Sequence, residues 1–319
     1  MILRYKLEKY KGAGSRHTCP RCKGKREFTR YIEISTGKEL HPDVGKCNRI
    51  VKCGYHYTPK QFFASQRTFK PNYYVPKPKK IKTNPIYIKD ISFIPDKMFI
   101  ESKNNYEKNN FILFLRKKFD SKTIIEELID KYNIGTSDKW KGSTIFWQKD
   151  IHGNIRTGKI MLYDPMTGKR VRKPYSHISW AHNNIKNFKL EQCLYGEHLL
   201  SKDIKIVCLT ESEKTALIAS IYHPDNVWLA TGGISNLSLG QCRVLSGKRV
   251  VLFPDKGAYS IWWNKAMQIG KILPIKFIFC NILEDDTTIE SGEDLADYLL
   301  KNKPGVSSVS NKYVGRFSD

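Results

Sequence analysis

The spacing of apolar residues changes along the chain and is most regular in the second half. Short apolar runs at residues 204–209, 227–230, 249–253 and 275–279 have the length and composition of buried strands, and residues 213–221 have helical spacing. Strands that alternate with helical stretches indicate a parallel sheet covered by helices. This half is therefore predicted to have an α/β fold.

The preceding region follows a different pattern. Residues 143–171 alternate β-favouring residues with polar turns at 150–154 and 164–168, as in an antiparallel meander. Before them, residues 120–132 open with an Asp and a Ser that can cap a helix. The apolar positions of this helix are Ile124, Ile125, Leu128 and Ile129. The predicted fold class is α/β, and α+β overall, with a mixed middle region before the parallel sheet.

Two further segments lack this patterning. Residues 17–63 hold four of the eight cysteines among Gly, Arg and Lys, with too little apolar sequence for a core. Residues 69–85 are rich in Pro and Lys, which predicts an extended basic linker. The predicted organisation is a cysteine-containing domain at 1–68, a linker at 69–88, an α+β region at 89–190, a parallel-sheet domain at 191–305 and a loose, Ser-containing tail at 306–319.

The balance of charge changes the picture of what the chain binds. Its 319 residues are 40% hydrophobic, which is enough for real cores, but the formal net charge is +24 and the pI about 9.6. Such a charge concentrates polyanions, so nucleic acid is the expected partner. An AT-rich genome would explain part of the lysine excess, but not the shortage of acidic residues. The basic residues are dispersed, which argues against a membrane partner.

The sequence has no stretch near the roughly 20 apolar residues of a membrane span. Residues 1–11 lack the continuous apolar core of a signal peptide. We therefore expect a cytoplasmic protein with reduced cysteines, in which clustered cysteines indicate metal and scattered ones indicate burial. The scattered cysteines, expected in the core, are Cys193, Cys208, Cys242 and Cys280.

The clustered cysteines have the arrangement of a zinc ribbon. Cys19 and Cys22 are separated by two residues and followed by a glycine, and Cys47 and Cys53 form a second, more widely spaced pair that ends in a glycine. Two such turns can supply the four thiolates of a closed zinc site. Its ligation free energy replaces the missing core, so the zinc is structural. The wide second spacing leaves open that His17, His41 or His56 substitutes for a thiolate.

Acidic residues follow two strands of the predicted parallel sheet. Glu211 ends the first strand, just before a helix, and Asp255 ends the third. The carboxyl edge of a parallel sheet is where ligands bind, and two neighbouring carboxylates there suit Mg²⁺. Each acid also has a simpler interpretation: Glu211 can stabilise a helix N-terminus and Asp255 can form a turn.

These segments resemble a known family. Residues 210–216, 231–233 and 250–255 resemble the Toprim domain of DnaG-type primases, topoisomerases and some nucleases. The preceding zinc ribbon, the meander at 143–172 and the Leu-Tyr-Gly element at 194–196 are similar to the order of parts in primases. The short, Lys-rich version looks like Toprim proteins of Bacteroidetes and their mobile elements or phages.

The resemblance implies a set of metal-binding residues. The family uses a Glu after the first strand and an Asp-x-Asp after the third, which Glu211 and Asp255 match, but Gly257 replaces the second Asp. Asp294 and Asp297 fall where primases carry a further acidic patch, and either supply the missing oxygens or cap a helix. Glu213 either adds a carboxylate or faces solvent. The implied catalytic cofactor is Mg²⁺ or Mn²⁺.

Basic and aromatic residues are candidates for holding nucleic acid or nucleotide. Aromatic residues in the meander can stack on bases, although aromatics in strands more often belong to a core. These are Trp147, Tyr163, Tyr175 and Trp180. Basic side chains are expected to bind phosphates. Four of them are predicted around the meander turns, namely Lys159, Arg170, Arg172 and Lys173, and the fifth is Lys214.

Three functions are consistent with these features. The first is a primase-like nucleotidyltransferase on single-stranded DNA, in replication of a mobile element, plasmid or phage, with nucleotides as substrates and a separate helicase as an optional partner. The second is a non-catalytic DNA-binding accessory protein whose metal site is degenerate at Gly257. The third is a Toprim nuclease that uses water as the nucleophile. A topoisomerase would need more chain than 319 residues provide for its gate domains.

Overall fold

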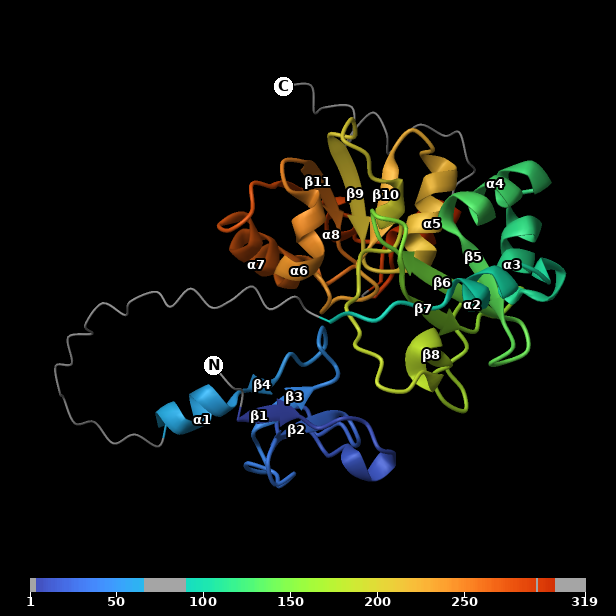
Figure 1. Cartoon of the computed structure of the whole chain (residues 1–319). Coiled ribbons are helices and arrows are strands. Elements are labelled where there is room, and N and C mark those ends of the chain that lie inside the picture. The colour runs from blue at the N-terminus through green and yellow to red at the C-terminus, as the bar shows by residue number, and fades with distance from the viewer. Residues whose placement is uncertain (1–3, 66–89, 291, 302–319) are drawn as a thin grey trace. The chain divides into compact units, whose positions relative to one another are not determined.

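The computed structural model describes residues 4–65, 90–290 and 292–301 (Figure 1). Contacts divide the chain into two units, Met1–Tyr87 and Ile88–Asp319, each described by itself. The predicted linker at 69–88 and the predicted tail at 306–319 lie outside the described residues. Among the helices that are described, none is long and apolar enough to cross a membrane.

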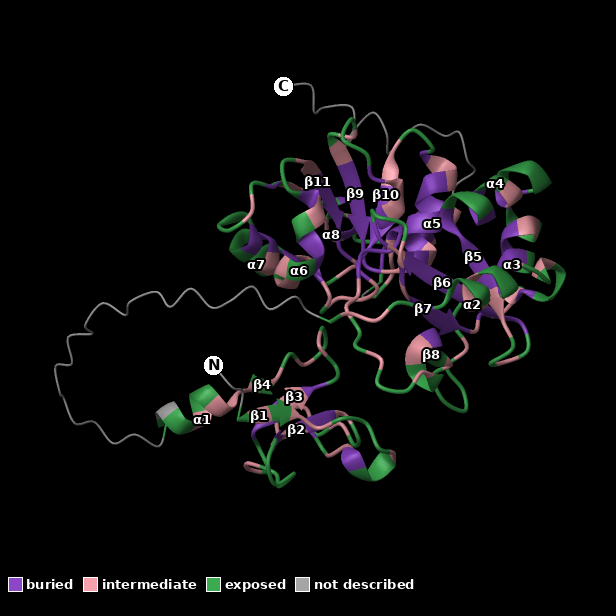
Figure 2. Cartoon of the chain, in the orientation of Figure 1, coloured by how far each residue is buried: buried purple, intermediate pink, exposed green. Residues whose placement is uncertain are grey.

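The first unit is built on a small antiparallel sheet in the order β1-β2-β3-β4. Its apolar core contains little more than Cys19, Phe28 and Cys47, with Cys22, Cys53 and Tyr55 against it. Most residues of this unit are exposed or half-buried (Figure 2), so a hydrophobic core does not account for its fold. Its elements are β1 (Tyr5–Leu7), η1 (Ala13–Ser15), β2 (Phe28–Glu33), β3 (Gly45–Cys47), β4 (His56–Tyr57) and α1 (Pro59–Ser65).

The second unit opens with helices and an antiparallel meander. The strand order β5-β6-β7-β8 confirms the predicted meander, with turns after β6 and β7. Strand β5 was not predicted because its sequence is short and contains a glycine. The elements are α2 (Asp96–Glu101), η2 (Tyr106–Lys108), α3 (Asn110–Lys118), α4 (Lys122–Tyr132), β5 (Ile134–Ser137), β6 (Ser143–Lys149), β7 (Ile155–Met161), β8 (Ile178–Trp180) and η3 (Ala181–Asn184).

Helix α4 confirms the helix predicted from residues 120–132. Its N-cap is Ser121, whose hydroxyl accepts from the amide of Ile124, and Asn133 ends it in a left-handed conformation. The predicted apolar face was wrong at Ile124, which is 44% exposed. That position lies in the first turn of the helix, while Ile125, Leu128 and Ile129 reach the core.

A fully parallel sheet in the order β10-β9-β11-β12 forms the rest of the unit, as predicted. Helix α5 packs on one side, in the core that also receives the meander, and α7 packs on the other (Figures 1 and 2). The fold is therefore mixed α/β with an N-terminal zinc ribbon. The elements are η4 (Glu197–Leu199), β9 (Ile206–Thr210), α5 (Glu213–Tyr222), β10 (Val227–Ala230), α6 (Leu239–Cys242), η5 (Arg243–Leu245), β11 (Arg249–Phe253), α7 (Tyr259–Gly270), β12 (Lys276–Phe279), α8 (Ile282–Asp285) and α9 (Leu295–Leu300).

Strand β9 shows why the sheet is buried on both faces. Val207 and Leu209 belong to the core beside α7, and Cys208 between them belongs to the core beside α5. Successive residues of a strand point to opposite faces, so a continuous apolar run is needed when helices cover both. The prediction that the scattered cysteines are core residues is confirmed for Cys193, Cys208, Cys242 and Cys280.

Candidate functional site

Four cysteine sulfurs converge in the first unit. The Sγ atoms of Cys19, Cys22, Cys47 and Cys53 lie within 4.8 Å of one another. Cys19 Sγ is 3.8 Å from Cys53 Sγ, and Cys22 Sγ is 3.9 Å from Cys47 Sγ. This arrangement suits tetrahedral zinc held by four thiolates and supports the structural zinc predicted from the cysteine spacing.

The three alternative histidines have other partners. His17 lies beside Glu39, the ring of His41 packs against Phe62, and His56 bonds with the Tyr31 hydroxyl at 3.0 Å. The wide second spacing is accommodated by a turn in which the Cys53 amide donates to the carbonyl of Arg49.

Backbone geometry prepares the cysteine site for a cation. A hydrogen bond from the Gly24 amide lowers the pKa of Cys22 to about 6, which favours its thiolate. Burial raises the pKa of Cys47 to about 12, a cost that a bound cation would offset. Zinc supplies that compensation, and the site fits a structural zinc ion.

The second unit brings two carboxylates together at the carboxyl edge of its parallel sheet. Glu211 follows β9 directly, and Asp255 lies two residues beyond β11. These strands are neighbours, with Phe253 opposite Thr210. The amide of Asp255 donates to Glu211 Oε1 at 3.3 Å, and Glu211 is only 6% exposed.

The electrostatics of this pair favour an added cation. Burial raises the pKa of Glu211 to about 7, against the lowering effect of the Asp255 amide. Burial also raises the pKa of Asp255 well above its usual range, and the charges of Glu211 and Asp294 raise it further, while Lys214 and Arg170 lower it. Asp255 Oδ1 is buried without a hydrogen-bond partner among the described residues. A divalent ion would satisfy that oxygen and restore both carboxylates to their charged form.

This arrangement predicts a pH-dependent effect of Mg²⁺ on stability. The pKa of Glu211 is raised from 4.5 to about 7 on folding. The contribution of Glu211 to the free energy of unfolding is therefore fully present below pH ~4.5. In the absence of cations it is lost as the pH rises through about 7. We expect Mg²⁺ to raise the unfolding temperature of the full chain more at about pH 8 than at about pH 5. Thermal unfolding with and without Mg²⁺ measures this, and an equal effect at both pH values would contradict it.

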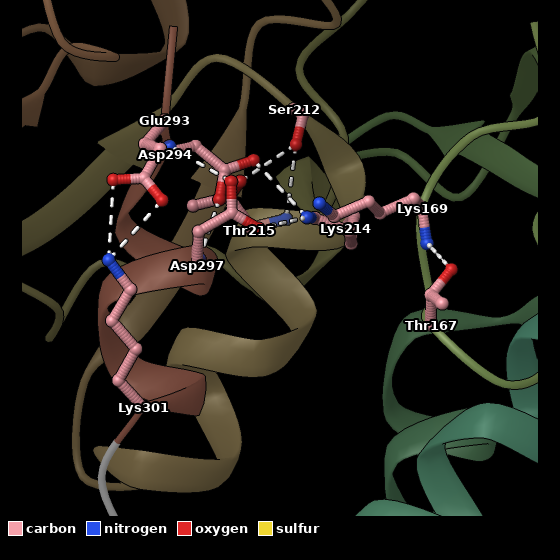
Figure 3. Close-up of polar contacts among 9 residues, drawn as sticks. All are labelled: Thr167, Lys169, Ser212, Lys214, Thr215, Glu293, Asp294, Asp297 and Lys301. Atoms are coloured by element: carbon pink, nitrogen blue, oxygen red, sulfur yellow. Dashed lines mark hydrogen bonds and ion pairs between the residues drawn. The ribbon is translucent and has the colours of Figure 1, made fainter. Parts of the chain in front are cut away.

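Asp294 and Asp297 begin a helix beside these carboxylates. They form the capping box of α9, in which the Asp294 side chain accepts from the Asp297 amide and the Asp297 side chain accepts from the Asp294 amide. The capping alternative is therefore what the structure contains. Lys214 extends from α5 to both acids, at 3.5 Å and 3.1 Å (Figure 3). Burial works against the charge of Lys214, but the two acids outweigh it and raise its pKa.

Lys159 and Glu213 form a buried ion pair between the two sheets. Lys159 Nζ lies 3.1 Å from Glu213 Oε2 and 2.9 Å from the carbonyl oxygen of Gly232. The placement of Lys159 near a turn was wrong, because the residue lies inside β7. Glu213 does not face solvent either, since it is 1% exposed at the start of α5. Lys159 thereby joins the meander to the start of α5 and to the loop after β10.

Gly257 has a conformation and a partner that the sequence did not reveal. Its φ is +85°, a region that is strained for aspartate. Its amide donates to Glu284 Oε1 at 2.8 Å, and Glu284 lies in α8 after β12. The carboxyl-edge rule, applied to the fourth strand, would have identified Glu284.

The aromatic and basic residues predicted to bind nucleic acid differ in how exposed they are. Trp147 and Tyr163 are buried, as strand aromatics usually are, Trp180 is half-buried, and Tyr175 is exposed and stacks on His177. Arg170, Arg172 and Lys173 are exposed in the segment between β7 and β8. The positive charge of Arg170 lowers the pKa of Asp255, so this residue of the basic segment acts on the carboxylate site.

Comparison with known proteins matches two parts of the chain to family models. Residues 3–68 match the zinc beta-ribbon finger family. Residues 109–256 match a family described as "Domain of unknown function (DUF6371)". No curated protein matches the chain.

Solved structures similar to this chain include DNA primases. The primase fragment of the bacteriophage T7 primase-helicase is 14% identical, with a TM-score of 0.41 over 90% of this chain and 94% of that one. The DnaG catalytic core is 12% identical, with a TM-score of 0.45 over 65% and 74%. The zinc-binding and RNA polymerase domains of the Aquifex aeolicus primase are 12% identical, with a TM-score of 0.36 over 93% and 77%.

Proposed function

We propose that this protein is a metal-dependent, primase-like nucleotidyltransferase that acts on single-stranded DNA. The observation that carries the proposal is the Glu211 and Asp255 pair, which lies at the carboxyl edge of the sheet with an unpartnered oxygen and raised pKa values that a bound cation would lower. The sequence resemblance to Toprim primases and the net charge of +24 support the same function.

Each group has a role in this proposal. Glu211 and Asp255 hold Mg²⁺ or Mn²⁺, which when bound neutralises the phosphates of a nucleotide and lowers the pKa of an attacking 3′-hydroxyl. Arg170, Arg172 and Lys173 bind phosphates of the nucleotide or template, because they are exposed and Arg170 acts on Asp255. Lys214 keeps Asp294 and Asp297 neutralised, so those two acids support the site rather than ligate the metal.

One observation favours a second candidate, the non-catalytic DNA-binding accessory protein. Gly257 stands where the family pattern has an acid, and its positive φ disfavours a side chain there. A metal held by Glu211 and Asp255 alone would then keep more water and bind more weakly. In that case the basic segment would still bind DNA, but no synthesis would follow.

The experiment is incorporation of labelled ribonucleotides and deoxyribonucleotides on single-stranded DNA with Mg²⁺ or Mn²⁺. Metal-dependent extension products support the nucleotidyltransferase. DNA binding without products would overturn it in favour of the accessory protein. Cutting of the template, without extension, would indicate a nuclease that uses the same carboxylates.

A further inference from the structure

The first unit contains a second group of three potential metal ligands, which includes no cysteine. They are Glu8, His17 and Glu39, whose ligand atoms lie within 4.8 Å of one another. Glu8 comes directly after β1, while His17 pairs with Phe28 and Glu39 pairs with Ile32 at isolated bridges. Three separate segments thus each present one donor to the same point.

The imidazole of His17 lies close to a carboxylate but does not form a hydrogen bond with it. Its Nε2 lies 3.2 Å from Glu39 Oε1, yet the atom is buried and makes no hydrogen bond among the described residues. The contact therefore does not have hydrogen-bond geometry, and two ligands of a shared ion can lie at this distance. The other oxygen of Glu39 is occupied by Arg30 Nη1 at 2.7 Å, which orients the carboxylate and leaves Oε1 available.

The geometry points to a second metal site, formed by Glu8, His17 and Glu39, that binds a divalent transition ion such as Zn²⁺. One imidazole nitrogen and two carboxylate oxygens are ligands that zinc accepts, with water completing the coordination. Mg²⁺ is disfavoured because it rarely takes an imidazole nitrogen. The ion would join the end of β1 to the hairpin that contains Glu39, in a unit whose apolar core is too small to do so.

The competing interpretation is a His17 ring that pairs with Glu39 and holds no metal. Both arrangements bring the same atoms together, but they differ in what the chain binds. A metal site takes up an ion, whereas an ion pair takes up no metal. Cobalt distinguishes the two sites, since only thiolate ligation produces intense sulfur-to-metal charge-transfer bands.

The test is a Co²⁺ titration of the metal-free full chain near neutral pH, followed by absorption spectroscopy and by metal analysis after dialysis. We expect the cysteine-bound ion to give charge-transfer bands and the ion held by Glu8, His17 and Glu39 to give none. The double variant Glu8→Gln, Glu39→Gln is expected to bind one equivalent fewer than the unaltered chain, with unchanged charge-transfer bands. Those bands also report that the ribbon of the variant is folded.

The matched control is Glu33→Gln. Glu33 lies on the same unit and pairs with Arg4 at 2.9 Å, but does not belong to the cluster. This variant should bind as many equivalents as the unaltered chain. Equal binding of Co²⁺ by the unaltered chain and by the double variant would overturn the second site.

Discussion

Replacement of Glu211 by Gln should lower metal-dependent nucleotide incorporation by at least about 100-fold, since a bound metal contributes several kcal/mol of charge stabilisation and each 1.36 kcal/mol is tenfold. The amide keeps the shape of the side chain but removes the charge that attracts the cation beside Asp255. Asp255→Asn is expected to have an effect of the same order. Binding to single-stranded DNA should change little, because the exposed cations remain.

The same substitution should make the metal-free protein more stable. A neutral amide removes the cost of charging a buried group whose pKa is about 7, which is on the order of 3 kcal/mol at pH 8. Loss of activity together with a higher unfolding temperature would separate a metal-binding role from a folding defect. Asp203→Asn is the control, because this exposed acid precedes β9 at the opposite end of the strand. An active Glu211→Gln variant would contradict the assigned role.

Replacement of Cys47 by Ala should unfold the first unit while the second unit stays folded. Cys47 is 1% exposed and supplies one of the four sulfurs that take the place of a core. Structural zinc contributes about 10–16 kcal/mol of folding free energy in comparable small domains, far more than this unit can recover by apolar burial. Zinc content and the dispersion of amide signals in NMR spectra measure the two consequences separately.

A buried cysteine of the second unit provides the control for this variant. Cys242→Ala removes a thiol of similar burial from the core beside α7, and should retain zinc with only a modest loss of stability. Retention of zinc and of a folded ribbon in Cys47→Ala would contradict a four-cysteine site. In that case His17, His41 or His56 would have to supply the fourth ligand.

The sequence by itself determined the strands of the parallel sheet and the two central strands of the meander. They were predictable because their periodicity and turn residues are local properties, whereas the short strand β5 was not. The cysteine spacing predicted the zinc site for the same reason, since two short turns set the positions of its ligands. The strand ends also placed Glu211 and Asp255 at one edge, which follows from parallel pairing alone.

The tertiary structure alone decided which partners the charged side chains take. Lys159 has the sequence context of a phosphate-binding residue but is buried against Glu213, 54 positions away. Lys214 forms ion pairs with Asp294 and Asp297. Glu284, which follows β12, accepts a hydrogen bond from the amide of Gly257, which follows β11. Long-range ion pairs depend on packing between sheets and helices, which no local pattern encodes. For the same reason Glu8, His17 and Glu39 could be recognised as a cluster only once the ribbon had brought their three segments together.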